Sequence, residues 1–150
     1  MANTDYRLIN EQLSSIISGV PYTMTNLANA SALLFEKLEG IMWAGFYIIK
    51  DGKLVLGPFQ GKVACTIIAI GKGVCGTVAK EDRTIVVPDV DKFPGHIACD
   101  SASRSEIVVP IHRNGELFGV LDIDSHLLNR FDDNDRKGLE EFVSILEKGI

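Results

Sequence analysis

Two Asx-Gly dipeptides constrain the fold of this chain more than any other feature. Asp51-Gly52 and Asn114-Gly115 each stand between two apolar runs of β type. Such pairs favour the two-residue turns that link antiparallel strands, because both turn residues adopt positive φ angles. The sequence therefore predicts two hairpins and a mainly antiparallel sheet. The flanking runs are 43–50 and 53–56 for the first pair, and 105–113 and 116–123 for the second.

Segments with helical periodicity lie before and after the predicted strands in the sequence. Apolar residues recur every three to four positions in the segments 9–17, 24–38 and 132–146, and a short helix is expected near 74–80. A short strand is expected at 84–87, whereas 57–73 and 89–104 are poorly periodic. Loops of that length inside a compact domain are usually functional. No repeat or linker interrupts the 150 residues, so we expect one α+β domain spanning 1–150.

Charge and hydropathy exclude several classes of partner. The net charge is −5, from 15 basic and 20 acidic residues, and no basic block is present, which argues against nucleic-acid binding. No apolar run approaches the roughly 20 residues of a membrane span, and the first residues lack the pattern of a secretory signal. We therefore expect a cytoplasmic protein without a membrane partner. Thiols stay reduced in that compartment, so the three cysteines are spare core residues or redox groups.

Two carboxylates share one face of the strand predicted at 119–124. Because side chains alternate along a strand, Asp122 and Asp124 point to one side, and Leu121 and Ile123 to the other. Neighbouring carboxylates raise each other's pKa, and burial raises it further. The pair therefore suggests a site for a cation or amine, or a proton donor. The alternative is an edge strand with a solvated face.

A similar alternation applies to the first predicted strand. Trp43, Gly45 and Tyr47 share one face, and an indole and a phenol separated by glycine suit the wall of a pocket. Ordinary core packing is the alternative interpretation. The alternation along these two strands does not by itself distinguish a functional site from ordinary packing or a solvated face.

The cysteines lie outside the predicted central strands. Cys65 and Cys99 fall in the two long loops, and Cys75 lies at a predicted helix start, where the helix dipole is expected to favour its thiolate. The paired C-x2–4-C spacing of structural zinc sites is missing, so we expect no metal. A Cys-His nucleophile is also conceivable, with three histidines available. These are His96, His112 and His126.

Six segments together resemble one known family, the free methionine-(R)-sulfoxide reductases, which are catalytic members of the GAF-domain fold. The resemblance covers nearly all the chain from Trp43 onward and includes the spacing of all three cysteines. It implies one GAF-like catalytic domain, with a central antiparallel sheet of about six strands flanked by helices. The segments are GPFQG at 57–61, GKGVCG at 71–76, VPDV at 87–90, FPGHIACD at 93–100, SRSEIVVP at 103–110 and GVLDID at 119–124.

The resemblance also implies roles for particular residues. Cys99 matches the cysteine that attacks the sulfoxide, Cys65 its usual disulfide partner, and Cys75 a second, resolving thiol. Glu106 and the two aspartates match the polar substrate pocket, and Trp43 its aromatic wall. Attack leaves Cys99 as a sulfenic acid, which condenses with a nearby thiol to a disulfide that a thioredoxin-like dithiol reduces, without a cofactor.

Proton donation and substrate choice complete this expectation. Glu106 or Asp124 donates the proton that the sulfoxide oxygen needs. The ammonium of the free amino acid pairs with Asp122, and its carboxylate suits the backbone of the loop that contains Ser101 and Ser105.

Two other functions stay open from the sequence. The same pocket in a non-catalytic GAF module would bind a small molecule or sense redox state, and a third possibility is a purely structural dimerisation domain. A homodimer is expected only by analogy with other GAF domains.

Overall fold

The computed structural model describes residues 3–96, 99 and 101–150. The elements are α1 (Tyr6–Ile17), α2 (Thr23–Lys37), β1 (Trp43–Lys50), β2 (Lys53–Gly61), β3 (Ile67–Ala69), α3 (Gly73–Glu81), β4 (Ile85–Val87), η1 (Val90–Lys92), β5 (Ser105–Arg113), β6 (Glu116–Ser125), α4 (Asp133–Leu146) and η2 (Glu147–Gly149). The strands form one antiparallel sheet in the order β3-β2-β1-β6-β5-β4.

Both predicted hairpins are confirmed. At the β1–β2 turn Asp51 has a φ of 51° and Gly52 of 74°, and at the β5–β6 turn Asn114 has 54° and Gly115 79°. Two consecutive positive φ angles are what the favoured two-residue hairpin turn requires. The hairpins meet where β1 pairs with β6, so these two strands lie at the centre of the sheet.

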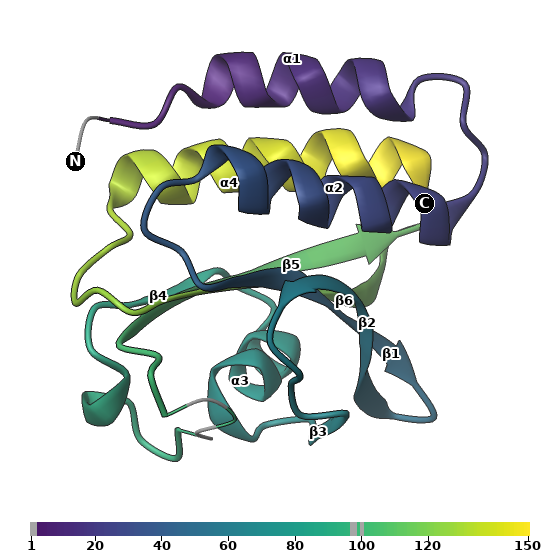
Figure 1. The fold of residues 1–150 in the computed structure, drawn as a ribbon. Helices are drawn as coiled ribbons and strands as arrows, with labels where there is room; N and C mark the ends of the chain where they lie inside the picture. The colour runs from purple at the N-terminus through teal and green to yellow at the C-terminus, as the bar shows by residue number, and fades with distance from the viewer. Residues whose placement is uncertain (1–2, 97–98, 100) are drawn as a thin grey trace.

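The sheet separates two layers, which confirms the α+β class. Helices α2 and α4 cover one face of the sheet and α1 packs on these two helices, while α3 lies on the other face (Figure 1). Alternate residues of the strands feed two separate apolar clusters: Phe46 and Leu121 belong to the cluster under the three helices, and Tyr47 and Val120 to the one beside α3. None of the described helices is long and apolar enough to cross a bilayer.

The segment 57–73 is more regular than its sequence indicates. Strand β2 continues to Gly61 after a shift in the β1–β2 register between Gly45 and Tyr47, and β3 adds a short edge strand. Gly57, Pro58 and Gln60 have little intrinsic preference for strands, so no β pattern is visible there. Pairing with β1 makes this stretch a strand nonetheless. The expected long loop is therefore much shorter.

Helices α1 and α4 pack closely at Gly138. The Tyr6 ring lies over this glycine, and its hydroxyl donates a 2.6 Å hydrogen bond to Asp135 Oδ1. An alanine Cβ at position 138 would overlap that ring. Gly138→Ala is therefore expected to lower the free energy of unfolding by about 1–3 kcal/mol, although alanine ordinarily stabilises a helix relative to glycine. Urea denaturation measures this, with the exposed helical change Ser144→Ala as control; equal or greater stability of Gly138→Ala would contradict the packing.

Candidate active site

A cavity opens on the α3 face of the sheet and collects most of the predicted site residues. It has about 640 Å³ of space unoccupied by protein atoms, a figure that includes the open mouth. Strands β1, β5 and β6 supply its floor, and α3 and the loops around Cys65 and Cys99 supply its walls. The predicted residues that line it are Trp43, Tyr47, Cys75, Cys99, Glu106, Asp122 and Asp124.

A disulfide joins two of the three cysteines at this cavity. Cys65 is bonded to Cys99, with 5.6 Å between their Cα atoms and 34 positions between them in the sequence. Cys99 is exposed and Cys65 half-buried. The pairing implied by the family resemblance is therefore present, and it brings the two long-loop cysteines to the cavity mouth. It also rules out a zinc site that uses both of these thiolates in this state.

The expectation for the Cys75 thiolate is wrong. Cys75 does lie in the first turn of α3, but it is only 4% exposed and faces the carboxylates of the sheet. Burial, and then the charges of Asp122 and Glu106, raise the pKa of its thiol well above the ordinary value. These effects outweigh the helix dipole, so Cys75 is a neutral thiol that donates to Asp122.

Three carboxyl groups form the floor of the cavity. Glu106 on β5 pairs directly with Asp124 on β6, and Asp122 lies two residues further along β6. Glu106 is 5% exposed and Asp122 6%, which excludes the alternative of a solvated edge strand. Asp122 Oδ1 is buried and has no hydrogen-bond partner among the described residues. It is therefore available to a cationic or donor group of a ligand.

Burial and crowding favour the protonated form of the acids in this cluster. The pKa of Glu106 is raised well above its usual value, first by burial and then by the charges of Asp122 and Asp124. Burial also raises the pKa of Asp122, opposed by hydrogen bonds from Glu106 and Cys75. A buried carboxylic acid beside a reactive sulfur has the character of a general acid.

The aromatic wall is built by β1 and the end of β2. The Trp43 ring stacks on Tyr47, with 6.0 Å between centroids, and on Phe59, with 5.2 Å. A Cβ at Gly45 would overlap Phe59, so the glycine admits this third ring rather than a ligand. Trp43 Nε1 donates to Lys62 O at 3.1 Å, and the Tyr47 hydroxyl to Cys65 O at 2.9 Å. The wall therefore also holds the backbone that carries Cys65.

The two serines expected near the substrate lie elsewhere. Ser101 is exposed and does not line the cavity as described. Ser105 is fully buried and points to the helix side of the sheet, where its hydroxyl donates to Leu127 O. Strand alternation explains this, because its neighbour Glu106 faces the cavity. Ser103 belongs to the same predicted loop, 101–105, although it is not named individually there, and it lines the cavity with a buried hydroxyl that has no partner among the described residues.

Of the three histidines, His96 alone lines the described cavity. His112 is engaged elsewhere, with Nε2 2.7 Å from Asp82 Oδ1 and its backbone N–H donating to Glu147. His126 is exposed. A metal could in geometry be held by Cys75, Glu106 and Asp122, whose ligand atoms lie within 4.8 Å of one another.

Comparison with known proteins shows which family the chain belongs to. Residues 14–150 match the model of the GAF domain. The chain is 49% identical to the free methionine-R-sulfoxide reductase of Escherichia coli (strain K12), over 95% of this chain and 87% of that protein. It superposes on the substrate complex of Staphylococcus aureus fRMsr with a TM-score of 0.95 at 50% identity, covering 99% of this chain and 97% of the other.

A second solved structure agrees. The free methionine-R-sulfoxide reductase from Neisseria meningitidis, in complex with its substrate, has a TM-score of 0.93 and 45% identity, covering 99% of this chain and 92% of that one. In each comparison the match covers most of both proteins, so the similarity is not confined to one segment of the chain. The chain therefore belongs to the GAF-domain family and, within it, to the free methionine-R-sulfoxide reductases.

Proposed function

We propose that this protein reduces free methionine-(R)-sulfoxide to methionine, with Cys99 as the nucleophile. One observation carries the proposal: an exposed cysteine, already joined to a second one, stands at a cavity whose floor holds three carboxyl groups, and burial raises the pKa of one of them, Glu106. A reactive sulfur, a resolving thiol and a proton donor are the three groups that this reduction needs. We infer that residues 1–150 act as one catalytic domain.

The proposed reaction has two steps within the protein. The Cys99 thiolate attacks the sulfoxide sulfur, the sulfoxide oxygen takes a proton from Glu106 or Asp124, and the oxygen passes to Cys99 as a sulfenic acid while methionine leaves. The Cys65 thiol then attacks the Cys99 sulfur and releases water, which forms the disulfide. Two electrons therefore move from the thiol pair to the sulfoxide.

Recognition of a free amino acid follows from the charges of the cavity. The buried Asp122 oxygen suits the substrate ammonium, and the Trp43 ring suits its S-methyl group. The substrate carboxylate fits the loop at 101–105, where the Ser103 hydroxyl is available as a donor. A methionine sulfoxide within a peptide has no such ammonium and is expected to bind poorly.

An external dithiol of the thioredoxin type completes the cycle in this proposal. Its thiolate attacks the disulfide, a mixed disulfide forms, and its second thiol releases the reduced protein. The exposure of Cys99 supports such access. A cytoplasmic location and a homodimer stay predictions; sedimentation velocity tests the second.

The decisive experiment incubates the reduced protein with each epimer of free methionine sulfoxide and dithiothreitol, and measures methionine. We expect turnover of the R epimer and little of the S epimer or of N-acetylated substrate. Binding of the R epimer without methionine release would instead indicate a non-catalytic binding or sensing module. No binding and no thiol change would indicate a structural domain.

The two remaining cysteines are expected to behave differently when replaced. The Cys65→Ser variant should still release one methionine per protein molecule. It should lose recycling by thioredoxin, because the sulfenic acid on Cys99 then has no thiol at position 65 to form a disulfide with. Cys75→Ser keeps a hydrogen-bond donor toward Asp122 and should keep most of both activities. Single-turnover methionine release and thioredoxin-coupled turnover measure the difference. Equal loss of recycling in the two variants would contradict the Cys65 assignment.

A further inference from the structure

Two buried serines lie directly behind the carboxylates of the cavity. Ser105 begins β5 and Ser125 ends β6, and the two are cross-strand partners next to the pair formed by Glu106 and Asp124. Both serines are 0% exposed. Because side chains alternate, their hydroxyls lie on the helix side of the sheet while the carboxylates face the cavity.

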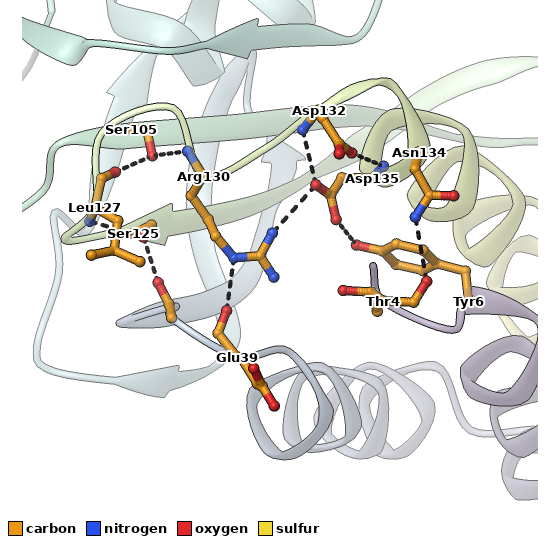
Figure 2. Close-up of polar contacts among 11 residues, drawn as sticks. Thr4, Tyr6, Glu39, Ser105, Ser125, Leu127, Arg130, Asp132, Asn134 and Asp135 are labelled. Atoms are coloured by element: carbon orange, nitrogen blue, oxygen red, sulfur yellow. Dashed lines mark hydrogen bonds and ion pairs between the residues drawn. The ribbon is translucent and has the colours of Figure 1, made fainter. Parts of the chain in front are cut away.

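The serine hydroxyls connect these strand ends to the segment that follows. Ser105 Oγ donates to Leu127 O at 2.5 Å and accepts from the Arg130 backbone N–H at 3.3 Å. Ser125 Oγ donates to Gly40 O and accepts from the Leu127 N–H at 3.0 Å. Figure 2 shows both hydroxyls beside the Leu127 peptide, which is therefore bonded from both strands.

Arg130 anchors the far end of the same segment, residues 126–131, to the helical layer. Its side chain is 6% exposed, and Nε donates to Glu39 O at 2.7 Å while Nη1 lies 3.3 Å from Asp135 Oδ2 (Figure 2). The second oxygen of Asp135 accepts from Tyr6. The hydroxyls thus attach the strand ends to a segment that is itself fixed to α1, α4 and the α2–β1 connection.

The end of the β5–β6 ladder needs such an attachment for a physical reason. Two carboxyl groups directly opposite each other on paired strands repel when both are ionised, and the β5–β6 ladder has only the Ser105–Ser125 pair beyond them. Glu106 and Asp124 occupy such a position. A displacement of about 1 Å in a catalytic group can lower a rate about 100-fold.

We infer that Ser105 and Ser125 are positioning residues of the reduction: by fixing the ladder end through the Leu127 peptide, they hold Glu106 and Asp124 at the separation that proton donation requires. The inference rests on the proposed function. It replaces the expectation that Ser105 contacts the substrate, since its hydroxyl is on the opposite side of the sheet.

The test compares Ser105→Ala and Ser125→Ala with Ser31→Ala, which removes an equally buried hydroxyl, bonded to Ala28 O within α2. We expect kcat for methionine formation to fall roughly 10- to 100-fold in the first two variants, with a smaller change in KM, and to be unchanged in the control. Ser105→Thr keeps the hydroxyl but adds a methyl group to a filled space, so it should lower Tm and retain kcat.

A readout without substrate separates this inference from the proposed function. Titration of the Glu106 carboxyl by ¹³C NMR should show a lower midpoint in both alanine variants, because looser strand ends reduce repulsion, and no shift in Ser31→Ala. If the wild-type protein reduces neither epimer, the proposed function fails while the titration still tests the positioning. Folded alanine variants with wild-type kcat and midpoint would overturn the inference. Should Ser105→Ala not fold, Ser105→Cys, a weak donor of similar size, takes its place.

Discussion

Cys99→Ser is expected to lower the rate of methionine formation at least about 1000-fold. Serine at this position is not ionised at neutral pH and is a far weaker nucleophile toward sulfur than a thiolate. Cys65 is not expected to substitute, because its backbone is tied to the aromatic wall through the Tyr47 hydroxyl. Multiple-turnover assays with dithiothreitol measure the effect.

Substrate binding provides the control for this variant. The serine side chain leaves the carboxylates and the Trp43 ring in place, so calorimetry should still detect binding of the R epimer. Retained turnover in Cys99→Ser would contradict the nucleophile assignment. Loss of binding together with turnover would show that the cavity, and not only the chemistry, depends on the thiol.

Glu106→Gln is expected to lower kcat by about 10²- to 10⁴-fold, the usual contribution of a general acid. The glutamine amide has a similar size and can still form hydrogen bonds, but it has no acidic proton to donate to the sulfoxide oxygen. In the wild-type protein the raised pKa of Glu106 keeps its proton above the ordinary value of 4.5, and kcat should fall as pH rises through the folded pKa. That limb of the pH profile should be absent from the residual activity of the variant.

The same change is expected to stabilise the fold. The unfolded carboxyl loses its proton near pH 4.5, whereas the folded one keeps it to higher pH, so the free energy of unfolding falls as pH rises between these two values. Glu106→Gln removes that penalty, and its advantage should vanish below the lower value. Denaturation at several pH values measures this against the exposed control Glu116→Gln.

The kcat values of two variants decide which carboxyl group donates the proton. If Glu106→Gln lowers kcat less than Asp124→Asn does, the proton donor is Asp124.

Much of this fold follows from local sequence signals. The Asx-Gly pairs predict both hairpins, because no other turn chemistry is so specific, and the alternation of Asp122 with Leu121 and Ile123 places the carboxylates correctly. The cysteine pairing could not come from spacing, since two loops meet only in the folded chain. It came from the family resemblance.

The errors share a physical cause, which is tertiary context. The helix dipole at Cys75 is real, but the facing carboxylates come from strands far away in the sequence. The extension of β2 depends on pairing with β1, because residues such as Gly57 have little strand preference of their own. From the sequence, Ser105 is expected both to begin a strand and to belong to the loop that binds the substrate carboxylate, and the sheet register shows that its side chain faces away from the cavity.

The alternation along β6 has a consequence for how the chemistry is encoded. If the β5–β6 pairing slipped by one residue, Leu121 and Ile123 would enter the cavity and both aspartates would face the apolar core. The Asn114-Gly115 turn and the register shift between Ile111 and His112 together set this pairing, although both lie at the opposite end of the hairpin from Glu106. The orientation of the carboxyl groups in the cavity therefore depends on turn and bulge geometry remote from it. A one-residue change of register there would turn the aspartates away from the cavity without replacing any residue that lines it.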